Sequence, residues 1–399
     1  MSMLSIQDLQ LQGKKVLVRV DFNVPLKDGQ VADDSRIRAA LPTLQYVLEQ
    51  GGLPVICSHL GKPKGEFRQD LSLQPVAKRL SELLQQDVLL APDCIGPEVK
   101  SKLQELQPGQ ILLLENLRFH PGETSNDTEF SKNLVSLADV YVNDAFGVVH
   151  RAHASVHGVP QQFSQACAGL LLQKEVQFLS QALLQPEHPF VLISGGSKVS
   201  DKLGILQNLM PQVDRILVGG AMSNTFRKAQ GYPVGNSKTE DELLTSARQI
   251  MDQAKEKGVS FYLPVDYVMA QGPKSQSPSG VFPFQDVPEQ DMILDTGPAT
   301  HALFSEALKD AKTVVWNGPM GVFENPAFSQ GSVGLAQSVA SLQHALTIVG
   351  GGDTDALIHD CQLQERVSFI STGGGSFLEF MEGKELPGLQ VLGFQAQKG

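Results

Sequence analysis

A chain of 399 residues exceeds what one hydrophobic core usually serves, so its length favours two domains. Its 43 acidic and 32 basic residues give a net charge of −11, which argues against nucleic acid or an anionic membrane surface as a partner. The four cysteines form no CxxC pair, no apolar run approaches the roughly 18 residues of a membrane span, and no signal-peptide pattern is present. We therefore expect a cytoplasmic protein.

Short apolar, β-branched runs recur along the chain, and a helical pattern usually follows each one. Every run ends in a polar or glycine-rich break. Strands alternating with helices predict mainly parallel sheets covered on both faces, which bind ligands at the carboxyl ends of their strands. The runs with their breaks cover residues 15–23, 53–61, 111–119, 139–147, 190–198, 215–223, 261–269, 313–321, 346–354 and 367–375.

The breaks differ in chemistry between the two halves of the chain. Those of the second half read SGGSK, VGGAM, WNGPMG, VGGGDT and STGGG and offer bare backbone N–H groups to a ligand. Glycine and arginine are common at loop ends, which could explain any single break. Nearly all of the breaks, however, share the chemistry of the half of the chain in which they lie. Those of the first half offer guanidinium, ammonium and imidazole groups, from Arg19, His59, Lys62, Arg118, His150 and Arg151.

Arg36 opens a predicted helix in which Ile37, Leu41, Leu44 and Leu48 form the buried stripe. An arginine in the first turn opposes the helix dipole unless an anion pairs with it. Either a ligand or the neighbouring residues 33–34, both Asp, could supply that anion, so the pattern alone leaves the role of Arg36 open.

Three histidines, His150, His153 and His157, could lie on one helical face and suggest a metal site. No carboxylate or cysteine stands at ligand spacing, so we favour anion binding by His150 and Arg151 instead.

The segment 171–186 joins the two halves. Leu172, Val176, Leu179 and Leu183 follow helical spacing, and Pro186 ends the pattern. We expect a first domain over residues 1–170, a connecting helix over 171–186 and a second domain over 187–388.

In the break IVGGGDT, glycines stand between an apolar run and a helical pattern, where unpaired N–H groups and the helix dipole attract phosphate. Asp353 would repel that phosphate unless a cation lay between them, and a carboxylate beside phosphates suits Mg²⁺. The alternative is that Asp353 is a helix N-cap.

Lys198 and Lys202 stand four residues apart at the start of a predicted helix with the apolar stripe Val199, Leu203, Leu206 and Met210. Like charges at this spacing repel each other, and the helix dipole disfavours both, so a bound anion would offset two penalties. A solvated pair screened by Asp201 is the alternative.

The familiar nucleotide fingerprints are missing. The chain contains neither GxxxxGK[ST] nor GxGxxG, since Leu378 occupies the third glycine position after Gly373 and Gly375. P-loop enzymes and dinucleotide-dependent dehydrogenases are thereby disfavoured. A basic half and a glycine-rich half suggest phosphoryl transfer between a magnesium nucleotide and a small anionic metabolite.

Eight blocks in chain order resemble the signature sequences of the phosphoglycerate kinase family. They are RVDFNVP (19–25), SHLGKPKG (58–65), NLRF (116–119), NDAFGVVHRAHAS (143–155), GGSKVSDK (195–202), WNGPMGVFE (316–324), GGGDT (350–354) and STGGG (371–375).

The resemblance implies two Rossmann-like three-layer α/β/α domains with mainly parallel sheets, joined by a helix across a hinged cleft. It implies a glycolytic, monomeric enzyme that transfers phosphate reversibly from 1,3-bisphosphoglycerate to MgADP, giving 3-phosphoglycerate and MgATP. In the reverse direction the nucleophile is a carboxylate, already ionised at neutral pH, so no general base is required. The family also suggests that the tail 389–399 completes the first domain.

Residue roles carry over from the matching blocks. Arg36 and Lys198 would be catalytic, and Asp353 would bind Mg²⁺. The substrate-binding set is Arg19, Asp21, Phe22, Asn23, Arg36, His59, Leu60, Gly61, Lys62, Arg118, His150 and Arg151. The nucleotide-binding set is Gly196, Ser197, Lys198, Lys202, Gly219, Gly220, Asn317, Pro319, Glu324, Gly350, Gly351, Gly352, Asp353, Thr354, Gly373, Gly374 and Gly375.

The chain also departs from the family pattern. Lys62 stands where the family usually has arginine, which replaces a planar fork by a point charge and predicts weaker phosphoglycerate binding. A catalytically silent, nucleotide-binding homologue that acts as a sensor or scaffold is the alternative function, although Arg36, Lys198 and Asp353 are all present. Other departures, on the nucleotide side, are Ser197, Ala221, Ser223, Thr296, Ser376 and Phe377.

Overall fold

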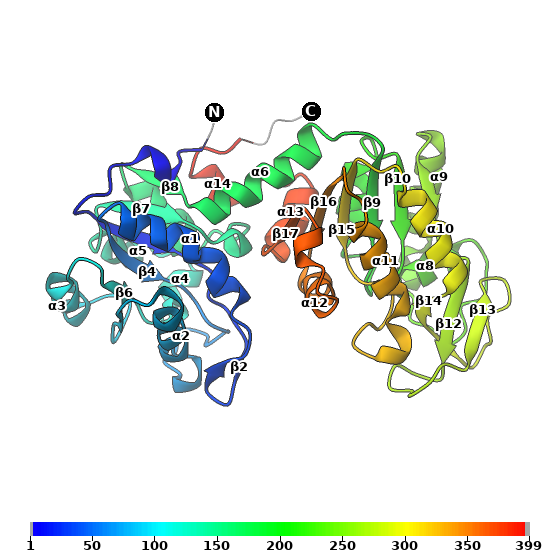
Figure 1. Ribbon diagram of the computed structural model, residues 1–399, viewed down its shortest axis with the longest axis horizontal. Coiled ribbons are helices and arrows are strands. Elements are labelled where there is room, and N and C mark those ends of the chain that lie inside the picture. Colours follow the sequence, from blue (N-terminus) through cyan, green and yellow to red (C-terminus); the bar gives the residue numbers. More distant parts are fainter. Residues whose placement is uncertain (1–2, 396–399) are drawn as a thin grey trace. The chain divides into compact units, whose positions relative to one another are not determined.

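The computed structural model describes residues 3–395, so the predicted tail 389–399 lies partly outside the described residues. Within them the chain forms two compact units. The first contains the residues up to Gln177 and returns at Glu385, and the second spans Phe178–Lys384. The boundary between Gln177 and Phe178 falls inside one helix, α6 (Leu170–Leu184). In each unit helices flank a central sheet (Figure 1).

The first unit is built on a six-stranded sheet in the order β5-β6-β4-β1-β7-β8, in which every pair is parallel. Strands covered on both faces read as continuous apolar runs, and four of the five residues of β1 and of β4 are buried. The strands are β1 (Lys15–Arg19), β4 (Leu53–Cys57), β5 (Val88–Leu90), β6 (Ile111–Leu113), β7 (Val140–Asn143) and β8 (Ala166–Ala168).

The helices of the first unit pack their apolar faces on this sheet. In α1, Ile37 and Leu44 are fully buried as predicted, but Leu41 and Leu48 are only half-buried, because Ala40 and Val47 face the core instead. The helices are α1 (Ser35–Glu49), α2 (Gln74–Leu84), α3 (Pro97–Glu105), α4 (Pro121–Thr124), α5 (Thr128–Val135) and α14 (Pro387–Gln390), and a short hairpin joins β2 (Leu26–Lys27) to β3 (Gln30–Val31).

The last helix returns to the first unit. Gly388 N donates to Val149 O at 2.8 Å, and a Cβ at Gly388 would lie 2.9 Å from Val149 Cα. The close backbone contact therefore requires glycine at position 388.

The second unit has a parallel sheet in the order β11-β10-β9-β15-β16-β17 and a smaller antiparallel sheet, β13-β12-β14. The strands are β9 (Phe190–Ser194), β10 (Arg215–Val218), β11 (Ser260–Tyr262), β12 (Asp266–Ala270), β13 (Gly280–Pro283), β14 (Met292–Thr296), β15 (Thr313–Asn317), β16 (Leu346–Gly350) and β17 (Phe369–Ser371). The helices are α7 (Leu203–Leu209), α8 (Met222–Ala229), α9 (Leu244–Glu256), α10 (Pro298–Leu308), α11 (Gln330–Ala340), α12 (Gly352–Asp360) and α13 (Gly375–Met381).

The prediction of mainly parallel α/β sheets is confirmed, with two differences in detail. The run 261–269 contains two strands, β11 and β12, which belong to different sheets. The second difference is the antiparallel sheet itself, which the strand–helix alternation did not predict. No helix between residues 3 and 395 is long and apolar enough to cross a membrane.

Candidate anion-binding sites

The first unit gathers its cationic breaks at one sheet edge. Arg19 ends β1, His59 follows β4, Arg118 follows β6 and Arg151 follows β7. These four strands are neighbours in the sheet and run parallel, so their carboxyl ends share an edge. We call this group, with Asp21 and Arg36, the basic site.

Arg118 supplies an unpaired donor in the basic site. Its Nη1 donates to Gly61 O at 2.7 Å, but its buried Nη2 has no hydrogen-bond partner among residues 3–395. Burial, with Arg19 and Arg151 nearby, lowers the pKa of Arg118 to about 10, so the side chain remains charged at neutral pH. A buried, charged and unpaired N–H is costly unless an anion accepts from it.

Arg36 pairs with Asp21 rather than with the acids beside it in sequence. Its Nη1 lies 3.0 Å from Asp21 Oδ2 and 3.3 Å from Asn23 O. Asp34 instead bonds Arg38 at 2.8 Å and Arg79 at 2.7 Å. The alternative in which residues 33–34 supply the anion for Arg36 is therefore wrong. Arg36 points instead to the loop after β1.

His59 is held as a neutral imidazole. Burial, then the charges of Arg19 and Arg118, lower its pKa well below the usual value. Arg19 Nη2 lies 3.2 Å from His59 Nδ1, and because a guanidinium can only donate, Nδ1 accepts and the ring proton sits on Nε2. The basic site thus presents an N–H from His59 as well as guanidinium groups.

Arg19 is fully buried and its guanidinium is engaged inside the protein. Its Nε donates to Ser155 Oγ at 2.8 Å, and its Nη1 donates to Val20 O. Ser155 Oγ in turn donates to Glu123 Oε1 at 2.6 Å, and Ser155 N donates to Glu123 Oε2 at 2.9 Å. Glu123, which is also fully buried, therefore balances Arg19 through Ser155.

The loop after β4 uses several predicted contacts internally. The N–H groups of Leu60 and Gly61 donate to Asn116 Oδ1 at 3.2 Å and Asn23 Oδ1 at 2.8 Å. Phe22 and Leu60 have buried side chains, whereas Lys62 is exposed. These bonds fix the loop that carries His59.

The histidines after β7 do not form a metal site. Burial, with the charge of Arg151, lowers the pKa of His150 to about 4, and burial with Arg118 does the same for His153. His157 Nδ1 lies 3.1 Å from Asn126 Nδ2. Within residues 3–395 the only cluster with metal-ligand spacing involves a different histidine, His120.

The second unit brings its glycine-rich breaks to one edge as well, after β9, β10, β15, β16 and β17. These loops touch backbone to backbone. A Cβ at Gly318 would lie 2.3 Å from Gly195 O, and one at Gly220 would lie 2.5 Å from Gly196 O. Only glycine allows this approach, and we call these loops the glycine site. The amides of Gly195, Gly196 and Gly220 bond inside it, to carbonyl groups of residues 317–320, so the expectation of bare N–H groups is wrong for them.

Two polar side chains tie the glycine loops together. Asn317 Nδ2 donates to Gly350 O at 2.5 Å, and Gly318 N donates to Thr354 Oγ1 at 2.8 Å. Lys202 Nζ donates to Asn317 Oδ1, and burial lowers the pKa of Lys202 to about 8.

The prediction that both lysines stand at the start of a helix is correct for Lys202, the N-cap of α7, and wrong for Lys198. The helix α7 begins only at Leu203, so Lys198 lies outside it and Lys202 precedes its first residue. Their environments differ, since Lys198 is exposed and Lys202 is buried. Repulsion along one helical turn therefore does not act on them.

Asp353 is not the cap of its helix. The N-cap of α12 is Gly351, with φ of 97°, and Asp353 lies in the first turn after it. Its carboxylate is exposed and accepts no hydrogen bond from another residue within 3–395. A free carboxylate beside exposed helix amides matches the hard oxygen ligand that Mg²⁺ prefers next to a phosphate.

A cavity of about 350 Å³ adjoins the glycine site. The breaks Gly196 and Gly220 line it together with Glu324 and Asp353. Its remaining walls come partly from strands of the antiparallel sheet, which were not predicted, and partly from the loop after β15. They include Tyr267, Leu294, Asp295, Met320 and Val322.

Asp295 is a buried acid in this wall. Burial raises its pKa to about 7, although its carboxylate accepts from Gly331 N at 2.7 Å and Thr296 N at 2.9 Å. Both bonds are to backbone groups, so Asp295 holds the wall in place. A larger hollow of about 730 Å³ lies at the β2–β3 hairpin in the first unit, but its charged residues are largely paired with one another, as Asp34 is with Arg38 and Arg79.

A mainly parallel α/β protein with one basic and one glycine-rich anion site is typical of a kinase that acts on a small anionic metabolite. The family model "Phosphoglycerate kinase" matches residues 6–384. The chain belongs to the phosphoglycerate kinase family, and with it to the kinases that transfer a phosphoryl group to the carboxyl group of 3-phosphoglycerate.

Similar proteins extend over the whole chain. The phosphoglycerate kinase of Maridesulfovibrio salexigens is 51% identical over 391 residues, 97% of this chain and 98% of that protein. That of Moorella thermoacetica is 51% identical over 392 residues, 98% and 99% of the two chains.

Solved structures agree. Phosphoglycerate kinase from Coxiella burnetii has a TM-score of 0.88 at 44% identity, covering 98% of this chain and 99% of that one. The enzyme from Pyrococcus horikoshii has a TM-score of 0.86 at 32% identity, covering 98% of both. Nothing in these comparisons supports the silent homologue.

Proposed function

We propose that this chain is a cytoplasmic, monomeric glycolytic enzyme that transfers phosphate reversibly from 1,3-bisphosphoglycerate to MgADP. Its partners would be small molecules, with no nucleic acid or membrane among them. The observation that carries the proposal is the buried, unpaired Nη2 of Arg118 beside the N–H of neutral His59. That arrangement suits an anionic substrate, since the unsatisfied Nη2 of Arg118 gains an acceptor.

The basic site would hold phosphoglycerate through three kinds of contact. Arg118 and Arg151 would bind its anionic groups, His59 would donate from Nε2, and Arg36 would reach the group in transfer. Because Asp21 already orients Arg36 at 3.0 Å, little side-chain entropy remains to be lost when the substrate arrives. Arg19 would position His59 rather than touch the substrate, since its guanidinium is fully buried.

The glycine site would hold the nucleotide. Amides of the glycine loops would approach the phosphates, the cavity of about 350 Å³ would take the base and ribose, and Glu324 would bind the ribose hydroxyls. Asp353 would hold Mg²⁺, which when bound neutralises phosphate charge. Lys198, exposed and outside any helix, would follow the transferring phosphoryl group and stabilise its charge.

Phosphoryl transfer requires the donor and acceptor oxygens to come into line, so we propose that both sites act on one phosphoryl group during turnover. The two compact units would then be the substrate and nucleotide domains, with α6 as the connecting helix. No residue has to remove a proton, because the attacking carboxylate is ionised at neutral pH.

The test is a coupled assay of acyl phosphate formation from MgATP and 3-phosphoglycerate. The unmodified protein should turn over, and Lys198→Ala should lower kcat by about 10²- to 10³-fold with a small change in the KM for either substrate. Lys309→Ala, at a side chain 74% exposed in the same unit, is the matched control and should leave kcat unchanged. If the unmodified protein binds MgATP without turnover, the silent homologue replaces the enzyme.

A further inference from the structure

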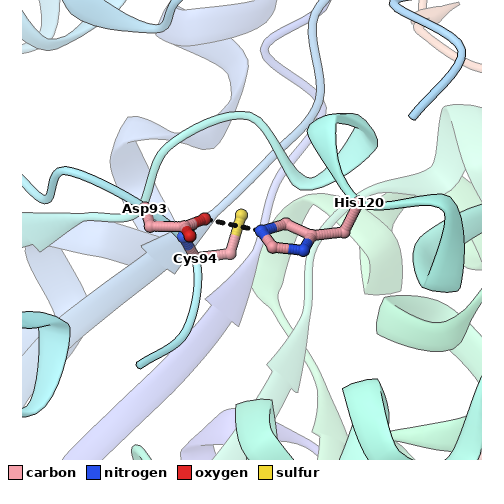
Figure 2. Close-up of side chains that lie close together, drawn as sticks. All are labelled: Asp93, Cys94 and His120. Atoms are coloured by element: carbon pink, nitrogen blue, oxygen red, sulfur yellow. Dashed lines mark hydrogen bonds and ion pairs between the residues drawn. The ribbon is translucent and has the colours of Figure 1, made fainter. Parts of the chain in front are cut away.

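Three side chains with different metal-binding atoms converge in the first unit, and none of them is assigned to phosphoglycerate. Asp93 and Cys94 follow β5, and His120 follows the short helical turn Leu117–Phe119 (Figure 2). Their carboxylate oxygen, sulfur and imidazole nitrogen all lie within 4.8 Å of one another. No local sequence pattern indicates this cluster, because His120 lies far from Asp93 and Cys94 in the chain.

We propose that Asp93, Cys94 and His120 form a binding site for a thiophilic divalent cation of the Zn²⁺ type. A thiolate, an imidazole and a carboxylate are the three protein ligands that zinc accepts together, with a fourth position open to water. Zinc bonds of about 2.0–2.3 Å place tetrahedral ligand atoms about 3.5 Å apart, so the present atoms need shifts of only about 1 Å.

Hydrogen bonds at Cys94 and ring stacking at His120 already hold the side chains of the cluster in place. Cys94 N donates to Asp93 Oδ1 at 2.6 Å, and Cys94 Sγ donates to Glu115 O at 2.9 Å. The ring of His120 stacks on Phe130 with centroids 5.2 Å apart. Ligands held by packing and backbone bonds lose little freedom when a metal binds.

The exposure of the three side chains increases from Cys94 to His120 to Asp93, as an open metal site requires. The Cys94 side chain is fully buried, whereas those of His120 and Asp93 are 27% and 45% exposed. An ion would therefore enter from solvent past the carboxylate and meet the sulfur at the inner end. Asp93 Oδ1 and His120 Nε2 are now 2.6 Å apart, so the ion would replace the hydrogen bond between them.

Binding would release the thiol proton of Cys94 to solvent and place the imidazole proton of His120 on Nδ1. This donor set also distinguishes the site from the magnesium site proposed at Asp353. Mg²⁺ prefers oxygen ligands and does not compete for a thiolate, whereas Zn²⁺ and Co²⁺ do.

The cluster borders the segment that carries Arg118. The Cys94 thiol is bonded to the carbonyl of Glu115, and His120 lies two residues after Arg118. A bound ion would tie the end of the segment 115–120 to the loop after β5 through His120, while release of the thiol proton would give up the bond from Cys94 Sγ to Glu115 O. We expect it to stabilise this part of the basic site, while the metal site itself stands independently of the proposed reaction.

The test is titration of the full-length, chelator-treated protein with Co²⁺ as a spectroscopic probe. We expect one equivalent to bind, with a thiolate-to-cobalt charge-transfer band in the near ultraviolet and the visible bands of a tetrahedral ion, both removed by Zn²⁺ but not by excess Mg²⁺. Cys94→Ser should remove the charge-transfer band, and His120→Gln should weaken binding by about 10²-fold, as loss of a ligand does.

Cys361→Ser is the control, since Cys361 is the only cysteine among residues 3–395 that is not buried. It should bind Co²⁺ like the unmodified protein. If Cys94→Ser does not fold, the His120→Gln variant and a zinc-dependent rise in Tm of the unmodified protein decide the question. Absence of the charge-transfer band, or its loss in Cys361→Ser, would overturn the proposal and leave an ordinary Asp93–His120 hydrogen bond.

Discussion

The two units solve one problem, holding an anion at the carboxyl ends of parallel strands, by opposite means. The basic site uses charged side chains, some of them already paired, as Arg36 is with Asp21 and buried Arg19 is with Glu123 through Ser155. The glycine site uses loops that pack backbone against backbone because they have no side chains, with Gly318 against Gly195. The first site should therefore be sensitive to changes in charge, and the second to added volume.

The largest effect among substitutions that test this difference is expected at Glu123. Glu123→Gln keeps the size of the side chain and removes the charge that balances buried Arg19, so the free energy of unfolding should fall by about 3 kcal/mol. His59 should also lose its orientation, which would raise the KM for 3-phosphoglycerate more than it lowers kcat.

Urea denaturation and steady-state kinetics measure both consequences. Glu129→Gln is the matched control, because its side chain is 75% exposed on α5, and it should change neither quantity measurably. Equal stability of the two variants would contradict the balance between Glu123 and Arg19.

The glycine site is tested by Gly318→Ala. The added Cβ would meet Gly195 O at 2.3 Å, and the backbone φ of 95° is itself unfavourable for alanine. We expect a loss of about 3 kcal/mol in stability and weaker nucleotide binding by isothermal titration.

Gly231→Ala separates strain from volume. Gly231 has a φ of 90° with no atom within 4 Å of an added Cβ, so only the backbone cost of about 1 kcal/mol should remain. If both variants lose the same stability, close packing of the loops is not what requires glycine at position 318.

The charged character of the basic site should also appear in the pH dependence of stability. Burial lowers the folded pKa of His153 to about 4, below its unfolded value of about 6.5. Between these values the unfolded chain binds more protons, so the stability contributed above pH 6.5 is lost as the pH falls toward 4.

His153→Gln removes this titration. Because His153 is partly accessible, we expect the loss of stability between pH 7 and pH 5 to be smaller in the variant by about 1 kcal/mol, measured by urea denaturation at both pH values. His188→Gln is the control at an exposed histidine, with a side chain 54% accessible, in the other unit. The same pH slope for His153→Gln and the unmodified protein would contradict a depressed pKa at His153.

The smallest effect is expected at Lys62, the exposed cation after β4. Lys62→Arg should lower the KM for 3-phosphoglycerate a few-fold, since a planar fork can bind an anion with two hydrogen bonds. Lys64→Arg, at a nearby exposed lysine, should leave it unchanged. An unaltered KM in Lys62→Arg would show that position 62 does not reach the substrate.

Sequence patterns predicted the parallel strands and the chemistry of their breaks, because burial on both faces and the strand-to-loop transition leave local signals. They missed β5 and β8, which have three residues each at the sheet edges and are too short for a clear pattern. They also missed the antiparallel sheet, because β12 pairs with β14, a strand more than twenty residues further along the chain, and such pairing leaves no local pattern.

Among the site residues, local reasoning failed where the partner is distant in the chain or where a helix starts later than its apolar stripe. Arg36 pairs with Asp21, fifteen residues away, and not with its neighbours. The stripe after Lys198 suggested a helix from Val199, but the helix begins at Leu203. Asp353 followed a good capping pattern, yet the helix begins one residue before it, and Gly351 with its positive φ is the N-cap.

The return of the chain at Glu385 makes the second unit an insertion within the first. During synthesis the whole inserted unit is translated before the residues that contact Val149. The first unit must then wait for α14, with the surface around Val149 uncovered, until the inserted unit has been translated. The chain's two units thus differ in the order in which they can be finished, the inserted one first.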